Sequence, residues 1–369
     1  MDFAYTAEQE ALRQLAEDVL SSADDAARLQ EVERDPTWFD RPLWRRLGQS
    51  DLLAVTTPTG VGGLGLGFLE ACLVVEQAGR TLAHVPLLPT LVGAGAVARF
   101  GTADHLTLLR PLVDGEGILT TAVRLARDQA PTSRSEGGRW VLDGELGFVP
   151  YAHVADRVVT VAGPAGAEGL FVVDPRADGV TVERQRTMSG DPQFVLRFAG
   201  TPAEALVAPG PGGSVAARWL RERLQVAYCA LELGIVETAL AMTAAYTSGR
   251  QQFGRPIATF QGVAHRMADA YIDVLAMRWT TLEAAAALGD DQEAAEAVAT
   301  AKWWACEGGH RVVSAAQHCH GGVGVDMSYP LYRYFLWSKE VEVALGGAAE
   351  QLAEVGRRLA GPPERTEPA

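Results

Sequence analysis

The spacing of apolar residues changes twice along the chain and divides it into three regions. From residue 1 to about 117 the pattern is helical, since Leu12, Leu15 and Val19 fall on one face of a helix that Thr6 is placed to cap. A second helix is expected over 67–83, after a loop at 57–67 in which repeated glycines break the period. We therefore predict that residues 1–117 form a helical domain.

The middle region, residues 118–212, has a sequence pattern that is typical of β-strands. Its β-branched runs, each bounded by Gly, Pro or Asp, occupy 138–149, 155–163, 167–175 and 179–186. Such runs are typical of an antiparallel sheet or a small barrel. The stretch "APGPGGS" at 208–214 is expected to be a linker that closes this β domain.

Long helical patterns return in the third region, residues 213–360. The expected helices cover 216–249, 257–288 and 291–319, and a shorter one covers the run "YPLYRYFLWSKE" at 329–340. The tail, residues 361–369, is predicted to be disordered. Helices, a small β domain and a helical bundle in this order indicate an α+β fold.

Composition narrows the range of partners and compartments. The formal net charge is −14, with 46 acidic and 32 basic residues, which argues against nucleic acid or an anionic membrane as the main partner. Four scattered cysteines without a CxxC pair suit a reducing compartment. The N-terminus lacks the basic segment of a signal peptide, and no uncharged apolar run reaches the ~18 residues that span a bilayer. We expect a cytoplasmic protein.

Two C-terminal stretches, "RQQFGRPIATFQ" at 250–261 and "HGGVGVDMSYPLYRYF" at 320–335, resemble the signatures of acyl-CoA dehydrogenases. The stretch 60–80 and the helix–sheet–helix order are similar to that family too, so the resemblance covers essentially the whole chain. It implies an N-terminal helical domain, a central β domain, a C-terminal four-helix domain and assembly as a tetramer. It also implies FAD as cofactor, an acyl-CoA thioester as substrate and α,β-dehydrogenation as the reaction.

The resemblance assigns a set of cofactor contacts that a subunit of this family lends to a neighbour's FAD. In this sequence they are Arg250, Phe253, Ile257, Gln261, His318, Gly321 and Gly322. An arginine suits this role because its planar fork grips pyrophosphate oxygens, and glycines let the backbone approach. The alternative is an arginine and an aromatic residue at a solvated helix start. A metal at "HCH", residues 318–320, is not expected, because adjacent side chains rarely converge on one ion.

The family's other flavin contacts are missing from this sequence. A loop of the form T-E-P-x-A-G-S-D corresponds to "AVRLARDQAPTSRSE" at 122–136, without the glycine or the acid–proline pair. The "W-I-T-N" element that covers the flavin corresponds to "LGFVPYA" at 146–152. In the E-G-T-x-Q element the glutamate is the usual catalytic base, and its position in this sequence is Leu345. The threonine position is Gly347, and the position of the final glutamine is Ala349. The other known position of the base, counted back from Arg250, is Leu224.

Three carboxylates lie near these two positions, namely Glu222, Glu340 and Glu342. We expect all three on charged, exposed helix faces, and Glu222 is turned about 200° away from Leu224 on an α-helix. The chain thus retains the residues that would contact a neighbouring subunit's FAD. It lacks the residues that would bind its own flavin and activate its own substrate. In this it resembles the base-lacking subunit of heteromeric α2β2 dehydrogenases of sterol side-chain catabolism.

Three functions remain open. The first is the non-catalytic partner of a base-bearing paralogue, with acyl-CoA as substrate of the complex and an electron-transfer flavoprotein as electron acceptor. The second is a homotetrameric flavoenzyme with an unrecognised base such as Glu222. The third is a flavin-free scaffold or acyl-CoA-binding protein.

Overall fold

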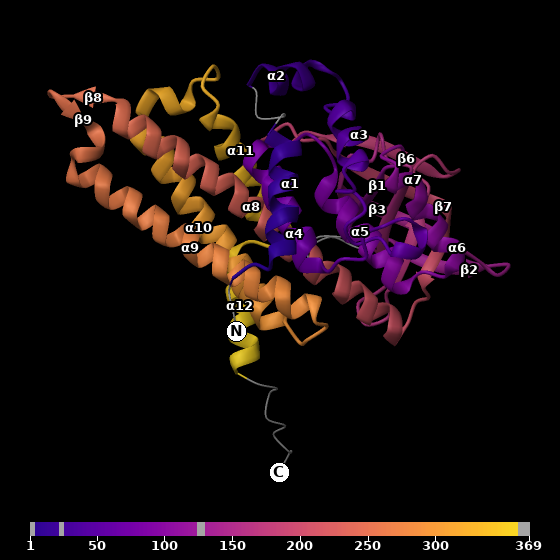
Figure 1. Cartoon of the computed structure of the whole chain (residues 1–369). Coiled ribbons are helices and arrows are strands. Elements are labelled where there is room, and N and C mark those ends of the chain that lie inside the picture. The colour runs from indigo at the N-terminus through magenta and orange to yellow at the C-terminus, as the bar shows by residue number, and fades with distance from the viewer. Residues whose placement is uncertain (1–3, 22–25, 124–129, 361–369) are drawn as a thin grey trace, which may run out of the picture.

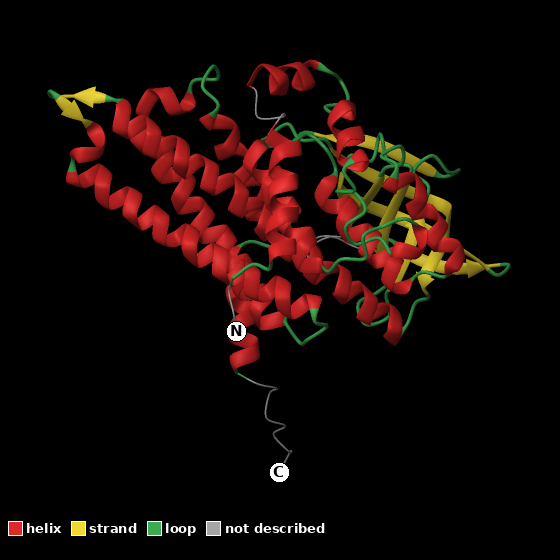
Figure 2. Ribbon diagram, in the orientation of Figure 1, coloured by secondary structure: helices red, strands yellow, loops and turns green. Residues whose placement is uncertain are grey.

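The computed structural model describes residues 4–21, 26–123 and 130–360 of the chain. The tail at 361–369 and residues 124–129 of the 122–136 stretch lie outside the described residues. Figure 1 shows long helices on one side of the molecule and the sheet with the shorter N-terminal helices on the other, and Figure 2 shows the same separation by type of element. The predicted α+β fold is confirmed.

The N-terminal region is helical, as predicted. Its helices are α1 (Ala7–Ser21), α2 (Ala26–Arg34), α3 (Arg41–Gln49), α4 (Phe68–Thr81), α5 (Leu87–Phe100), α6 (Ala103–Leu106) and α7 (Arg110–Val113), with short 3-10 turns at Thr59–Val61 and Thr107–Leu109. Thr6 caps α1 in a reciprocal arrangement with Gln9. The Gln9 N–H donates to Thr6 Oγ1 at 3.1 Å, and the Thr6 N–H donates to Gln9 Oε1 at 3.0 Å.

The sheet has seven strands in the order β1-β4-β5-β7-β3-β2, with β6 paired to β7. They are β1 (Leu119–Ala122), β2 (Thr132–Glu136), β3 (Arg139–Pro150), β4 (Arg157–Ala162), β5 (Gly169–Val173), β6 (Val180–Gln185) and β7 (Gln193–Val207). All pairs are antiparallel except β1 with β4, which is parallel. The four predicted strands correspond to β3, β4, β5 and β6, whereas β1, β2 and the long β7 were not predicted.

The C-terminal helices are α8 (Pro211–Gly249), α9 (Gln261–Gly289), α10 (Ala295–His320), α11 (Leu331–Val343) and α12 (Ala348–Leu359). A hairpin of β8 (Gln251–Gln252) and β9 (Arg255–Pro256) joins α8 to α9, with 3-10 turns at Ile257–Thr259 and Gly321–Val325. The predicted linker is shorter than expected, because α8 begins at Pro211. Gly213 lies in its first turn, where a Cβ would stand 1.9 Å from the Glu168 carbonyl oxygen.

Helix α8 runs through the centre of the molecule. It is long and apolar enough to cross a membrane by length and composition alone, but 61% of its most apolar window is buried inside the protein. Those side chains pack in the two helical cores against residues of α4, α9 and α10. Its apolar character is therefore accounted for by its position as a core helix.

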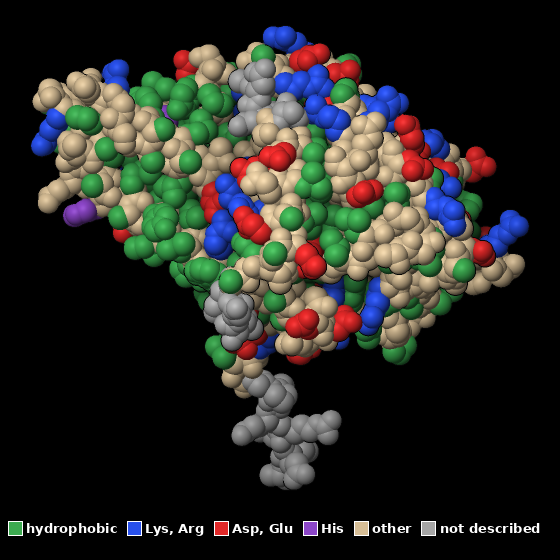
Figure 3. Space-filling model, viewed as in Figure 1, with side chains coloured by type: hydrophobic (Ala, Val, Ile, Leu, Met, Phe, Trp, Pro, Cys, Tyr) green, Lys and Arg blue, Asp and Glu red, His purple; other side chains and the backbone are tan. Residues whose placement is uncertain are grey.

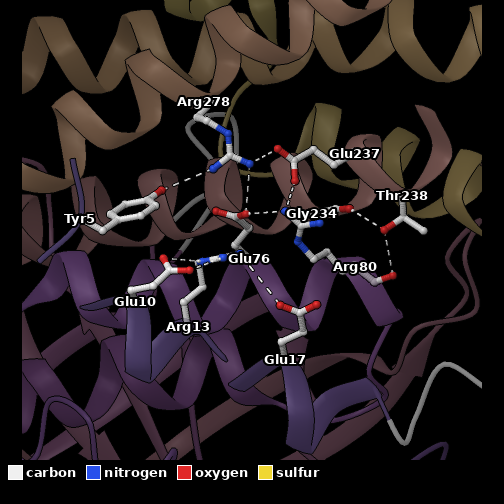
Figure 4. A network of polar contacts seen from close by, with 10 residues as sticks. All are labelled: Tyr5, Glu10, Arg13, Glu17, Glu76, Arg80, Gly234, Glu237, Thr238 and Arg278. Carbon is white, nitrogen blue, oxygen red and sulfur yellow. Dashed lines mark hydrogen bonds and ion pairs between the residues drawn. The ribbon is translucent and has the colours of Figure 1, made fainter. Parts of the chain in front are cut away.

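A network of charges ties α4, α8 and α9 together beside this core (Figure 4). Arg80 and Arg278 both pair with Glu76, at 3.0 and 3.3 Å, and both pair with Glu237. Arg278 also donates to the Tyr5 hydroxyl at 3.4 Å. Two cations and two anions balance one another, which is the condition under which buried charges are tolerated.

Candidate functional site

A cavity of about 440 Å³ lies where the N-terminal helices, the sheet and the C-terminal helices meet. The cavity is lined by the end of α4, residues 83 and 85–89, the ends of β1 and β3, the loop 189–193, the turn 344–347, and parts of α8, α11 and α12. Most lining side chains are apolar. No lysine or arginine is among the lining residues that the structure describes, and the charged ones are Asp191, Glu340 and Glu350.

Both positions at which the base was sought line this one cavity. Leu224 reaches it from α8 and Leu345 from the turn after α11. The turn is held by Gln225, whose Nε2 donates to the Leu345 carbonyl at 3.1 Å. Counting residues from each of the two motifs to its base position thus leads to the same cavity. In each case the residue is a leucine, whose side chain cannot accept a proton.

Glu340 also lines the cavity, so the expectation that it lies on an exposed face is wrong. Its carboxylate accepts hydrogen bonds from the Ser189 hydroxyl and, at 3.3 Å, from the Ser189 N–H. Burial, and then the nearby charge of Asp191, raises the pKa of Glu340 to about 7. The sequence showed only its helix, whereas its surroundings come from a loop 150 residues away.

Asp191 belongs to the same polar group of side chains. It accepts hydrogen bonds from the Tyr151 hydroxyl at 3.0 Å and from Gln193 Nε2 at 3.1 Å, and burial raises the pKa of its carboxyl group. Tyr228 lines the cavity from α8 and lies near both carboxylates, and burial raises the pKa of its hydroxyl. One wall of an otherwise apolar cavity is therefore polar and acidic.

The two other carboxylates point elsewhere. Among the described residues that line the cavity, α8 contributes Leu224, Tyr228 and Leu231, and Glu222 is not one of them. Glu222 is half-buried near Arg218 and Glu293, and burial raises its pKa. Glu342 is paired with Lys339 at 2.8 Å and His310 at 3.2 Å, and like Glu222 it is half-buried rather than fully exposed as expected.

Three non-glycine residues on the cavity wall have a left-handed backbone. Phe148, Tyr151 and Leu345 have φ values of 55°, 53° and 56°. The first two belong to "LGFVPYA", where the register of β3 against β7 shifts between Leu146 and Val149. Such conformations are costly for bulky residues and are concentrated at functional sites.

The residues predicted to contact FAD lie at the far end of the helical bundle. The hairpin β8–β9 carries Phe253 at its tip, with φ of 52° and 93% of the residue exposed. Arg250 and Gln261 are exposed on either side of it, and Ile257 is half-buried beneath. No ion pair holds the Arg250 guanidinium among the described residues, so its charge is available to a ligand or a partner.

The second motif lies at the same end. His318, Gly321 and Gly322 are exposed, and His320 of α10 stacks on Tyr246 of α8 with ring centroids 4.3 Å apart. The Gly321 N–H donates to the carbonyls that end α10, so it serves as a helix cap rather than as a free donor. In "HCH" the His320 ring donates to the Ala316 carbonyl and accepts from the Tyr329 hydroxyl.

The cavity and the exposed cluster around Arg250 are too far apart for both to contact one cofactor within one chain. The part of α8 from Leu224 to its end beside Arg250 is roughly 39 Å long at 1.5 Å per residue. The exposed arginine, aromatic tip and histidine suit the phosphate and adenine of FAD. The cavity of the same chain suits phosphate poorly, since its charged lining residues are all acidic.

The chain is similar to known proteins over nearly its whole length. Family models of the acyl-CoA dehydrogenase N-terminal and C-terminal domains match residues 6–116 and 214–360. The chain is 37% identical to acyl-CoA dehydrogenase FadE27 of Mycobacterium tuberculosis, over 98% of this chain and all of the relative. FadE28 of the same organism is 30% identical over 97% of this chain and 99% of the relative.

Among solved structures, the ChsE4-ChsE5 complex from Mycobacterium tuberculosis contains a chain with a TM-score of 0.92 and 36% identity, over 98% of this chain and all of that one. The Tcur3481-Tcur3483 steroid ACAD has a TM-score of 0.90 and 39% identity, over 96% of this chain and 98% of that one. Butyryl-CoA dehydrogenase from Megasphaera elsdenii, at 24% identity and a TM-score of 0.87, over 98% of this chain and all of that one, shares the fold.

Proposed function

The chain belongs to the acyl-CoA dehydrogenase family, and on that premise we propose that it is the non-catalytic subunit of an FAD-dependent dehydrogenase. It would assemble with a base-bearing paralogue as an α2β2 tetramer in the cytoplasm. The substrate would be an acyl-CoA, with a steroid side-chain thioester suggested by the similarity to the Tcur3481-Tcur3483 steroid ACAD. An electron-transfer flavoprotein would accept the electrons.

One observation carries this proposal: Leu224 and Leu345 line the same cavity, at both positions where the family places its base. The Cα proton of a thioester is weakly acidic, and its removal requires a carboxylate poised beside it. FAD supplies the hydride acceptor when bound. In the absence of a base at either position, the contribution of this chain is to bind and orient through Arg250, Phe253 and Gln261.

A stripe of exposed apolar residues on α9 supports assembly with another chain. Tyr271, Ile272 and Trp279 are 56%, 61% and 43% exposed, and Figure 3 shows hydrophobic side chains gathered on this flank of the molecule. Exposed apolar patches of this kind mark protein–protein contacts. Phe253 at the adjoining hairpin would be covered in the same assembly.

The test compares the chain alone with the chain co-expressed with a base-bearing paralogue. The complex is expected to hold one FAD per pair of unlike chains. The chain alone, supplied with excess FAD and an artificial electron acceptor, is expected to show no turnover of acyl-CoA. Turnover by the lone chain at ~1–10³ s⁻¹, the usual range for enzymes, would refute the non-catalytic role. Glu340→Gln would then show whether Glu340 is the base, and Glu222→Gln would test Glu222.

A further inference from the structure

This chain contains an open cavity although both base positions are leucines. A cavity without a ligand loses the dispersion contacts of its lining atoms, and cores normally collapse onto such space. At about 440 Å³ it falls within the range of about 300–1,000 Å³ that is usual for ligand pockets. The left-handed conformations of Phe148, Tyr151 and Leu345 hold its wall in place at a conformational cost.

The polar wall restricts what the cavity accepts. Glu340 and Asp191 both face it, and the lining has no arginine or lysine among the described residues to balance a carboxylate or phosphate. Burial raises the pKa of both carboxyl groups, and the charge of Asp191 adds to the rise at Glu340, whose pKa is about 7, so that below pH 7 the Glu340 carboxyl group is mostly protonated. A protonated carboxyl group both donates and accepts a hydrogen bond. The acidic wall of the cavity therefore repels an anionic ligand, whereas it can form hydrogen bonds with a neutral polar group of a ligand.

The Tyr228 hydroxyl adds a further polar group. It lies on the cavity wall near the two carboxylates, and no hydrogen bond joins it to another residue of the part of the chain that the structure describes. A buried polar group without a hydrogen-bond partner is stabilised when a ligand supplies that partner. The remaining lining from α8 and the 83–89 segment, including Leu224, Leu231 and Leu87, is hydrocarbon.

We propose that this cavity binds an uncharged, largely hydrocarbon alcohol, whose hydroxyl group hydrogen-bonds with the Glu340 carboxyl group and the Tyr228 hydroxyl. Its hydrocarbon part lies against the leucines of α8 and of the 344–347 turn. The exposed Phe148 and Val343 stand at the rim and mark the entrance. This binding concerns the chain's own cavity and does not depend on whether Arg250 serves a partner's cofactor.

Three probes with the same alkyl chain test the proposal by calorimetric titration of the full chain at about pH 6.5, below the Glu340 pKa of about 7: 1-decanol, decanoate and decylammonium. We expect 1-decanol to bind with a stoichiometry of one and decanoate to bind at least tenfold more weakly. Absence of 1-decanol binding, decanoate binding of equal affinity, or tighter binding of decylammonium would each overturn the proposal. FAD binding that excludes 1-decanol from the lone chain would also overturn it.

Variants then locate the binding within the cavity. Glu340→Leu removes the polar partner and the charge, so 1-decanol should bind about tenfold more weakly while decanoate gains. Tyr228→Phe should weaken 1-decanol alone, and Asp191→Asn should reduce the discrimination against decanoate if Glu340→Leu fails to fold. Glu342→Gln is the matched control on the same helix, because its carboxylate faces Lys339 and His310 instead of the cavity. Equal effects of Glu340→Leu and Glu342→Gln would contradict the placement.

Discussion

At the scale of single residues, an exposed arginine and a half-buried glutamate have different roles in ligand binding. Arg250 stands at the end of α8 with its guanidinium unpaired among the described residues, whereas Glu340 is enclosed with Ser189 and Asp191 at the cavity. The first is suited to a ligand outside its own chain, and the second to a ligand within it. Each therefore gives a prediction with a different measurement.

Arg250→Ala should weaken FAD retention by the complex of this chain with its base-bearing partner. A charge-assisted phosphate contact contributes about 1.5–3 kcal/mol, which corresponds to roughly ten- to hundredfold in affinity. The measurement is the FAD-to-protein ratio and the FAD affinity of the wild-type and variant complexes. Arg357→Ala is the control, because Arg357 is an exposed arginine on α12 whose one ion pair among the described residues is with Glu354 of its own helix. Unchanged retention in an intact Arg250→Ala complex would exclude the proposed contact in trans.

Glu340→Gln should change how stability depends on pH. Because the folded protein raises the pKa of Glu340 to about 7, the folded state binds more protons than the unfolded state between about pH 4.5 and 7. Stability from this group is therefore lost as the pH rises through that window. The variant should exceed the wild type by about 1–3 kcal/mol in urea denaturation at pH 8 and match it near pH 4. A constant difference at both pH values would show that the carboxyl group is not perturbed.

At the scale of elements, glycines set how closely α4 and α8 pack. A Cβ on Gly79 would stand 2.1 Å from the Leu231 carbonyl oxygen, and one on Gly234 would stand 2.0 Å from the Glu76 carbonyl oxygen. Backbone thus packs on backbone at this crossing. The Glu76, Arg80 and Glu237 side chains meet beside it (Figure 4). The close approach therefore also places the charges that bind the two helices to α9.

Gly234→Ala should push these helices apart and destabilise the fold. Overpacking of this kind costs about 1–3 kcal/mol, and separation of the ion pairs adds to it. The matched control is Gly356→Ala in α12, where a Cβ would meet no atom within 4 Å. That control should be neutral or more stable by about 0.5–1 kcal/mol, since alanine favours a helix. Urea denaturation measures the stability of both variants. Equal stability of the two would contradict the close packing of α4 on α8.

The elements also show why sequence reasoning succeeded in some places and failed in others. The end of α8 at Gly249 and the cap at Thr6 are encoded by neighbouring residues, so local patterns predicted them. Strand β7 was missed because Gly200 and Pro202 interrupt its apolar run, and pairing with three other strands holds it. Its stability comes from contacts that are distant in sequence.

The site was predictable only in its aliphatic part. Counting from the motifs selected Leu224 and Leu345, and both of these leucines line the cavity. Glu340 was misplaced because its burial depends on Ser189 and Asp191, which a remote loop brings to it. The buried Lys302 was likewise hidden, since its Nζ bonds the Val341 carbonyl, at 2.7 Å, from another helix. Long-range contacts of this kind leave no periodic signal in the chain.

At the scale of the whole molecule, the exposed apolar stripe of α9 should be the surface that holds the assembly together. Ile272→Glu places a charge in the middle of this stripe, where Ile272 is 61% exposed. A charge that would be buried without a partner on association costs several kcal/mol. The chain itself should fold normally, because the side chain points away from its own core.

Size-exclusion chromatography with light scattering of the co-expressed pair measures the effect. The wild type should elute as a tetramer of two unlike chains, and Ile272→Glu as separate chains or smaller species. Met188→Glu is the matched control, because Met188 is 59% exposed on the loop between β6 and β7, away from α9. If the α9 stripe forms the interface, loss of assembly should be accompanied by loss of FAD from the Ile272→Glu mixture, since Arg250 and Phe253 would then no longer reach the partner's cofactor. A tetramer that persists with Ile272→Glu would place the interface on another face of the molecule.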